Sequence, residues 1–399
     1  MPSVRRDVLR SILFLLAVAG LSVTGVGPAR AVDADGTAKQ PARLLVVTVT
    51  NGFRHGSIET AEGVLEKLGR ESGQFHIDSL RLPPGRPGQP QEPKRKDGTS
   101  DADWKKQEEA FKADLEKFKV ADAAWNKTLA DLFAKAFAKE SLDQFDGVVF
   151  CSTTGALPIP NLDEFLAWVK GGKTFIGFHA AADTFNASDA YRDLVGGVFA
   201  GHPWNAGDEH GFVVNDPGHP IVNSLPEAFR WKDEIYQYDT RFVPDDVRVL
   251  VSLDMPHSTP KEPWHVPVSW IRDFGHGRVF YSNFGHNEST WNEKMFQEHY
   301  LAGILWALGR INAPVTPNPD LQAREYLHGV LAAAAAAGAG GDAAKATAEA
   351  ETLCALADAK CAASPGWARS LRPMLLEIRG ADGNARSALY AKVLEEVAK

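Results

Sequence analysis

Three histidines follow short apolar runs that are typical of β-strands. His55, His179 and His286 stand in the segments TNGFRHGSIET, FIGFHAAADTF and YSNFGHNESTW. Open parallel sheets bind ligands beyond the carboxyl ends of their strands, so parallel strands would bring these histidines to one edge. Neutral imidazole binds divalent metals such as zinc, and its pKa near neutrality suits proton transfer. The pattern therefore predicts a histidine-lined site in which His55, His179 and His286 are candidate metal ligands.

His179 occupies a corner where other proteins carry a nucleophile. The stretch GFHAA, residues 177–181, has the spacing of the G-x-S-x-G turn between a strand and a helix. Histidine is a poor substitute for a serine or cysteine nucleophile, but it is well suited to general acid–base catalysis. Its expected partner is Glu234 in WKDEIYQYD, because neighbouring Asp233 would point to the opposite side of a strand. We expect His179 and Glu234 to form a catalytic pair.

Further side chains near these segments are candidates for substrate binding. Arg54 and His55 precede an expected helix, whose N-terminal N–H groups suit polar or anionic ligand atoms. His202 lies between Gly201 and Pro203, close to an aromatic ring, which suits a sugar-like ligand. No compact H-x-x-x-H or C-x-x-C motif fixes a metal geometry, so a divalent metal would depend on dispersed ligands. The expected substrate-binding residues are Arg54, His55, His202, Trp204, Tyr236 and His286.

Composition and the N-terminus define the class of protein. The chain has 399 residues, 44% hydrophobic content and a net charge of −8, without the basic stripe of a nucleic-acid-binding protein.

Residues 1–31 have the layout of an export signal: Arg5 and Arg6, an apolar core over residues 11–23, and a cleavage site ending at Ala31. Either the twin-arginine or the Sec route fits this layout. We expect a periplasmic or secreted protein with no integral membrane span after cleavage.

Alternating strands and helices predict an α/β domain over residues 42–312. Short apolar strands separated by helical segments are typical of a parallel sheet that is covered on both faces. We therefore expect a mostly parallel sheet in a three-layer sandwich. The expected strands are residues 43–49, 75–80, 145–150, 173–178, 211–214, 247–252, 267–272 and 278–282.

Two segments lie outside this pattern. Residues 82–141 begin with a loop rich in Pro and Gly and continue as a charged helical stretch, which we expect to form an inserted hairpin of helices. Its spaced apolar residues would pack on the domain. Residues 320–399 are rich in Ala and predict a small helical C-terminal domain. Cys354 and Cys361 lie in this domain, and their spacing allows either a disulfide or two free thiols.

Several of these segments together resemble the ThuA family of trehalose-utilisation-like proteins. The segments are VTNGFRHGSI, FDGVVFCSTTG, GGKTFIGFHAAADTF, GGVFAGHP, HPIVNSLPEAFRWKDEIYQY and VSWIRDFGHGRVFYSNFGH. The resemblance covers residues 42–308 and implies a class I glutamine amidotransferase-like, flavodoxin-like fold. It also implies that His179 replaces the elbow cysteine of the amidotransferases. The function that it implies is disaccharide or glycoside catabolism through 3-keto-sugar intermediates.

Three functions are consistent with these residues. The first is acid–base chemistry on a sugar or 3-keto-sugar, with or without a divalent metal, because an oxidised sugar acidifies its neighbouring C–H bond. The second is an amidotransferase-like hydrolase that uses Cys151, which ends the strand in FDGVVF, as its nucleophile. The third is a carbohydrate-binding module without turnover, with Phe53, Trp204 and Tyr236 among the aromatic rings that could stack on sugars. A small carbohydrate is the expected partner in the first and third cases.

Overall fold

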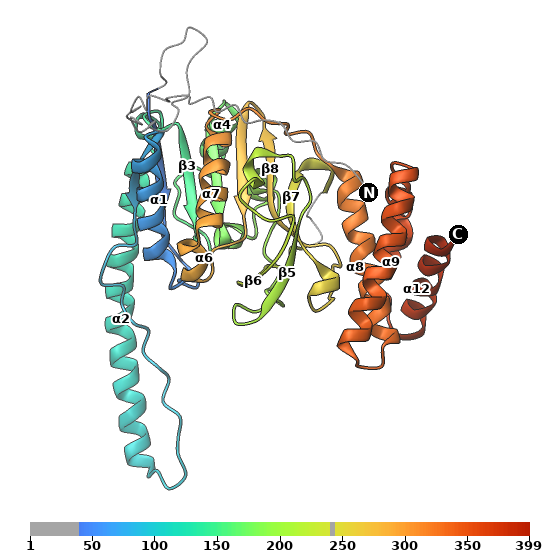
Figure 1. Cartoon of the computed structure of the whole chain (residues 1–399). Helices are drawn as coiled ribbons and strands as arrows, with labels where there is room; N and C mark the ends of the chain where they lie inside the picture. The colour runs from blue at the N-terminus through green and yellow to red at the C-terminus, as the bar shows by residue number, and fades with distance from the viewer. Residues whose placement is uncertain (1–39, 240–243) are drawn as a thin grey trace, which may run out of the picture.

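A nine-stranded sheet forms the centre of the molecule (Figure 1). The computed structural model describes residues 40–239 and 244–399, so the expected signal peptide lies outside the described residues. The strand order is β2-β1-β3-β4-β9-β8-β7-β5-β6. The strands are β1 (Ala42–Val47), β2 (Phe75–Leu80), β3 (Gly147–Cys151), β4 (Thr174–Phe178), β5 (Glu209–Val214), β6 (Ala228–Lys232), β7 (Arg248–Leu253), β8 (Pro267–Phe274) and β9 (Gly277–Ser282).

The sheet is mixed, so the prediction of a mostly parallel sheet is wrong. The pairs from β2 to β9 along the order are parallel, whereas β9-β8, β8-β7, β7-β5 and β5-β6 are antiparallel. For the β9-β8 pair the physical reason is the short connection between these strands, where Gly275 takes a positive φ of 66°. A two-residue turn can join only antiparallel neighbours, because a parallel pair needs a long crossover. The strands β1, β4 and β9 nevertheless lie in the parallel half, so their carboxyl ends share one edge.

Helices cover both faces of the sheet. Alternate residues of β1 point to opposite faces, so Leu44 and Val46 belong to one apolar cluster and Leu45 and Val47 to another. The first cluster includes residues of α1 (Ile58–Ser72) and α7 (Lys294–Ala307). The second includes residues of α4 (Leu162–Lys170) and α5 (Asp189–Val195). The short helices α3 (Lys139–Leu142) and α6 (Glu288–Asn292) complete this three-layer region.

The insertion is a single long helix and not the expected hairpin of helices. Residues 82–100 have no regular secondary structure and lead away from the sheet, and α2 (Asp101–Ala136) then runs for 36 residues back toward it (Figure 1). Pro and Gly occur only in the irregular part, so nothing interrupts the helix once it has begun. Trp125, Leu129 and Phe133 are buried against the sheet region. The outer apolar residues of α2 are only half-buried: Trp104, Phe111, Leu115 and Phe118.

The C-terminal residues form a helical bundle beside β7 (Figure 1). Its helices are α8 (Pro319–Gly338), α9 (Ala343–Ala363), α10 (Trp367–Ser370), α11 (Arg372–Ile378) and α12 (Gly383–Ala398), and they share their own apolar cluster. His257 links the sheet region to the bundle, because its Nε2 lies 2.9 Å from Glu351 Oε1 of α9. All three cysteines fall in the described residues and are free thiols. None of the described helices combines the length and apolarity needed to cross a bilayer.

Candidate functional site

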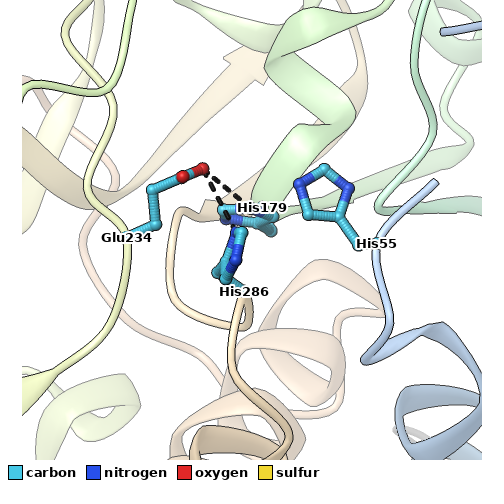
Figure 2. Close-up of side chains that lie close together, drawn as sticks. All are labelled: His55, His179, Glu234 and His286. Atoms are coloured by element: carbon cyan, nitrogen blue, oxygen red, sulfur yellow. Dashed lines mark ion pairs between the residues drawn. The ribbon is translucent and has the colours of Figure 1, made fainter. Parts of the chain in front are cut away.

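Four side chains from distant segments meet at the edge formed by the carboxyl ends of β1, β4 and β9. Each offers one ligand atom, and these atoms all lie within 4.8 Å of one another (Figure 2). His55 follows β1, His179 directly follows β4, and His286 follows β9. Glu234 comes from the segment after β6. The structure thus brings together the three strand-end histidines and the acidic residue expected beside them.

A tight corner places His179 in the cluster. The residue has a positive φ of 47°, a backbone conformation that side chains other than glycine rarely adopt. Gly177 permits the tight packing there, because a Cβ at this position would lie 2.9 Å from Tyr281 Cδ2. The hydroxyl of Tyr281 donates a hydrogen bond of 2.7 Å to the carbonyl oxygen of His179. These contacts hold the strained backbone and direct the imidazole inward.

The hydrogen bonds of His179 define its tautomer. Its Nδ1 lies 2.8 Å from the carbonyl oxygen of Asn283, and a carbonyl can only accept, so Nδ1 carries the proton. The lone pair of Nε2 therefore faces the cluster, 3.2 Å from the Tyr236 hydroxyl and 3.7 Å from Glu234 Oε1. Burial, with His55 and His286 nearby, holds the pKa of His179 well below its ordinary value. This is the arrangement of a metal-binding histidine with an oriented outer partner.

His55 and His286 complete the cluster with different electrostatics. Burial, and secondarily His286, lowers the pKa of His55 to about 4, so its imidazole is neutral. Its Nδ1 is buried and has no hydrogen-bond partner among the described residues. Burial also disfavours the charged form of His286, but Glu234 and Asp233 outweigh this effect and raise its pKa. The Nδ1 of His286 lies 3.2 Å from Glu234 Oε1.

These atoms fit a divalent cation. Three imidazole nitrogens and one carboxylate oxygen form a donor set that zinc and related transition metals accept. Tetrahedral zinc, with Zn–N of about 2.0–2.1 Å, has ligand atoms roughly 3.3 Å apart. The separations of 3.2 Å and 3.7 Å from Glu234 Oε1 are close to this value, whereas the wider separations in the set, which reach 4.8 Å, would have to shorten on binding. The Nδ1 of His55 is one of several buried polar atoms of the described residues without a hydrogen-bond partner, and it is available to bind an ion.

Two side chains connect this cluster to solvent. His202 is 52% exposed, and its Nδ1 lies 3.3 Å from Glu234 Oε2, the carboxylate oxygen that is not shared with the other histidines. Its ring stacks on Phe199 at a centroid distance of 6.1 Å. Phe53 is 66% exposed, and its ring centroid lies 4.9 Å from that of His55. A ligand that approaches the cluster can therefore meet an accessible imidazole and an accessible aromatic ring.

The other predicted binding residues differ in position. Tyr236 is buried and lies in the cluster, where it donates to His179. The guanidinium of exposed Arg54 donates to the carbonyl oxygen of Thr48, 3.0 Å away. The prediction that Trp204 binds substrate is wrong, because its side chain is only 1% exposed. It packs in the core, with its indole N–H donating to Thr259 O, so no ring face is open to a sugar.

Asp233 and Asn283 support the cluster, although the sequence did not identify either as a site residue. Buried Asp233 accepts hydrogen bonds from the backbone N–H groups of Gly285 and Asn287, at 2.7 and 2.9 Å, and so fixes the loop that carries His286. Asn283 accepts from His179 through its carbonyl and from the Tyr236 N–H through Oδ1. The sequence signal for a role of Asp233 was its position next to Glu234. The only signal for Asn283 was its position directly after an expected strand.

Cys151 is unsuited to nucleophilic catalysis. Its side chain is fully buried at the end of β3, and burial raises the pKa of the thiol far above its usual range. A thiol needs access and a lowered pKa to act as a nucleophile. The structure therefore gives no support to the hydrolase that would use this cysteine.

The sequence comparison identifies the family. Residues 43–307 match the ThuA family, described as trehalose utilisation, and this region is more than half of the chain. The chain belongs to the ThuA family. All four clustered residues fall within the matched region of this ThuA protein. No curated protein sequence matches the chain.

The solved structures that are similar to this ThuA protein include two ThuA-like proteins. A ThuA-like protein from Parabacteroides merdae ATCC 43184 has 17% identity and a TM-score of 0.47, over 71% of this chain and 99% of that chain. A ThuA-like protein from Bacteroides uniformis ATCC 8492 has 20% identity and a TM-score of 0.45, over 68% and 93%. With TM-scores this low, the two likenesses add no argument to the family match.

Proposed function

We propose that this ThuA protein is an enzyme of carbohydrate catabolism that performs acid–base chemistry on a sugar or 3-keto-sugar. The observation that carries the proposal is the convergence of His55, His179, Glu234 and His286, whose ligand atoms all lie within 4.8 Å of one another. These four side chains would hold a divalent metal, for which zinc is the first candidate. When bound, such an ion polarises a carbonyl or hydroxyl oxygen of the substrate.

The residues at the mouth of the site would move protons. We assign proton exchange with the substrate to His202, because it is exposed and its Nδ1 lies 3.3 Å from Glu234 Oε2, the carboxylate oxygen not shared with the other histidines. His179 is fully buried and its Nδ1 proton is committed to Asn283, so we assign it to ligand binding and not to proton transfer. Tyr236 keeps its proton, because burial raises its pKa well above the ordinary value, and can stabilise a developing negative charge.

An oxidised sugar is the substrate class that these groups suit best. A ketone at C3 acidifies the C–H bond at C2, so one base and one acid are enough for elimination, hydration or isomerisation. The description of the family as trehalose utilisation supports a disaccharide or glycoside source. The composition of residues 1–31 supports export, so the proposed place of action is the periplasm or the cell exterior.

The test combines metal analysis with turnover of an oxidised substrate. The mature protein would be loaded with zinc, analysed for bound metal and incubated with a 3-keto-glycoside and with its unoxidised parent. We expect one metal per chain and product formation from the 3-keto compound only. His202→Gln should keep the metal and reduce turnover. Tight binding of the unoxidised sugar without any product would indicate a binding module instead and would contradict the enzymatic proposal.

A further inference from the structure

A cavity of about 270 Å³ lies at the junction of the sheet region and the C-terminal bundle. Its wall includes Tyr238 and His265 from the sheet region, Tyr326 from α8, and Arg372 and Leu375 from α11. None of the four clustered residues of the candidate site lines it. The volume is slightly below the usual range for small-molecule sites, about 300–1,000 Å³. The proposed metal site therefore does not account for this cavity.

Two guanidinium groups and one carboxylate line the cavity. Arg372 and Arg379 both line it, and Asp239 is the single carboxylate among its described lining residues. Arg372 forms an ion pair of 3.1 Å with Asp245. Arg379 makes neither a hydrogen bond nor an ion pair with the described residues. Burial raises the pKa of Tyr326 to about 12; Arg379 and Arg372 oppose that shift and Glu262 adds to it, so all three charges act on its hydroxyl.

The remaining wall is apolar. Leu375 is fully buried, whereas Leu376 is 48% exposed and is one of the few large apolar side chains at the surface. Pro263 and Pro319 also line the cavity. The hydroxyl of Tyr326 donates a hydrogen bond of 3.2 Å to Leu375 O, which holds the ring in place. A pocket of this kind combines an apolar wall with a few polar groups that fix the orientation of a ligand.

We propose that this cavity binds a small organic anion. Its carboxylate or phosphate group would meet the guanidinium groups of Arg379 and Arg372, since a planar guanidinium can donate two parallel hydrogen bonds to either group. Its apolar body would lie along Leu376 and the Tyr326 ring. The free donors of Arg379 make it the primary anchor, because Arg372 already shares its charge with Asp245.

The experiment is a calorimetric titration of the full mature chain with three probes. These are 4-phenylbutyrate, its neutral amide 4-phenylbutyramide, and phenyl phosphate. We expect saturable binding of at least one anion and binding of the amide that is at least tenfold weaker. The comparison of carboxylate with phosphate distinguishes the two head groups. Equal affinity for the amide and both anions, or no binding of either anion, would overturn the proposal.

Matched variants locate the binding. Arg379→Gln should weaken the preferred anion at least tenfold, and Leu376→Asp should abolish binding by adding a negative charge to the wall. Arg369→Gln is the control, because Arg369 is half-exposed on α10, does not line the cavity, and makes ion pairs only at 3.9 Å. Thermal melting would verify that each variant is folded. Anion binding that is unchanged in folded Arg379→Gln would contradict the assignment.

Discussion

His179 holds its backbone in the left-handed region, with a φ of 47°, and this conformation costs about 1–3 kcal/mol for an ordinary residue. The hydrogen bond from Tyr281 to its carbonyl and the bond from its own Nδ1 to Asn283 maintain the strain. Strain that persists at a buried imidazole is consistent with a functional requirement for the side chain. It also means that different replacements at this position will have different effects on stability.

Two substitutions at His179 distinguish the contribution of its imidazole to metal binding and turnover from the effect of its backbone conformation on stability. Asn tolerates the left-handed region better than Ala does, so His179→Asn should melt at a higher temperature than His179→Ala. Both should lose bound zinc and lower turnover by at least about 100-fold, the upper end of the loss caused by removing an outer-shell partner. Metal analysis, the proposed assay and thermal melting measure these outcomes. Full metal content in either folded variant would refute the assignment of His179 as a ligand.

Phe53 is expected to act on substrate binding alone. It is 66% exposed beside His55, and an aromatic contact contributes about 0.5–1.5 kcal/mol beyond area burial. Phe53→Ala should therefore raise KM by roughly 2–12-fold, with kcat and bound metal unchanged. Phe53→Trp is the control that retains a ring. A fall in kcat at constant KM would show that the ring does not act by binding substrate.

At the scale of elements, α2 combines a buried end with a projecting end. Phe133 is fully buried in the cluster beneath the sheet, whereas Phe118 is half-buried farther out on the same helix. Phe133→Ala should lower the free energy of unfolding by about 3–5 kcal/mol, the usual cost of such a cavity. Phe118→Ala should lower it by about 1 kcal/mol or less. Denaturant titration of both variants tests this, and equal losses would show that the outer part of α2 is packed as firmly as its base.

At the scale of the whole molecule, His328 makes the stability of the C-terminal bundle depend on pH. Burial alone would lower its pKa, but Asp358, at 3.0 Å from Nε2, and Glu325, at 3.8 Å from Nδ1, outweigh burial, and the pKa is raised. A histidine whose pKa is raised in the folded state contributes stability that is fully present below its unfolded pKa of about 6.5. That contribution is lost as the pH rises through the pKa of the folded state. His257, between Asp254 and Glu351, shifts in the same direction.

The corresponding measurement compares His328→Gln with the parent protein. The parent should be the more stable at pH 6, and the difference should shrink as pH rises to 9 because the imidazolium is lost. Chemical denaturation at several pH values, followed by a probe in the bundle, gives this difference directly. A difference that is constant with pH would mean that His328 stays neutral in the folded protein.

The sequence predicted more of the site than of the architecture around it. Strand-end positions were enough to bring His55, His179 and His286 together, because β1, β4 and β9 are parallel to each other. Sheet direction beyond β9 depends on connection lengths and long-range pairing, which apolar patterning does not encode. Trp204 was wrongly predicted to bind substrate, because the sequence does not show whether an aromatic ring in a loop faces solvent or fills the core. The role of Asn283 depends on a backbone carbonyl, which no side-chain pattern reveals.

The length of α2 has a consequence for how the protein moves through solution. A helix of 36 residues extends about 54 Å at 1.5 Å per residue, and most of it stands clear of the sheet region (Figure 1). Such an outline increases translational friction, so the chain should diffuse and sediment more slowly than a compact particle of its 43.3 kDa mass. A monomer will therefore leave a gel-filtration column early, and its subunit count has to come from light scattering or sedimentation equilibrium.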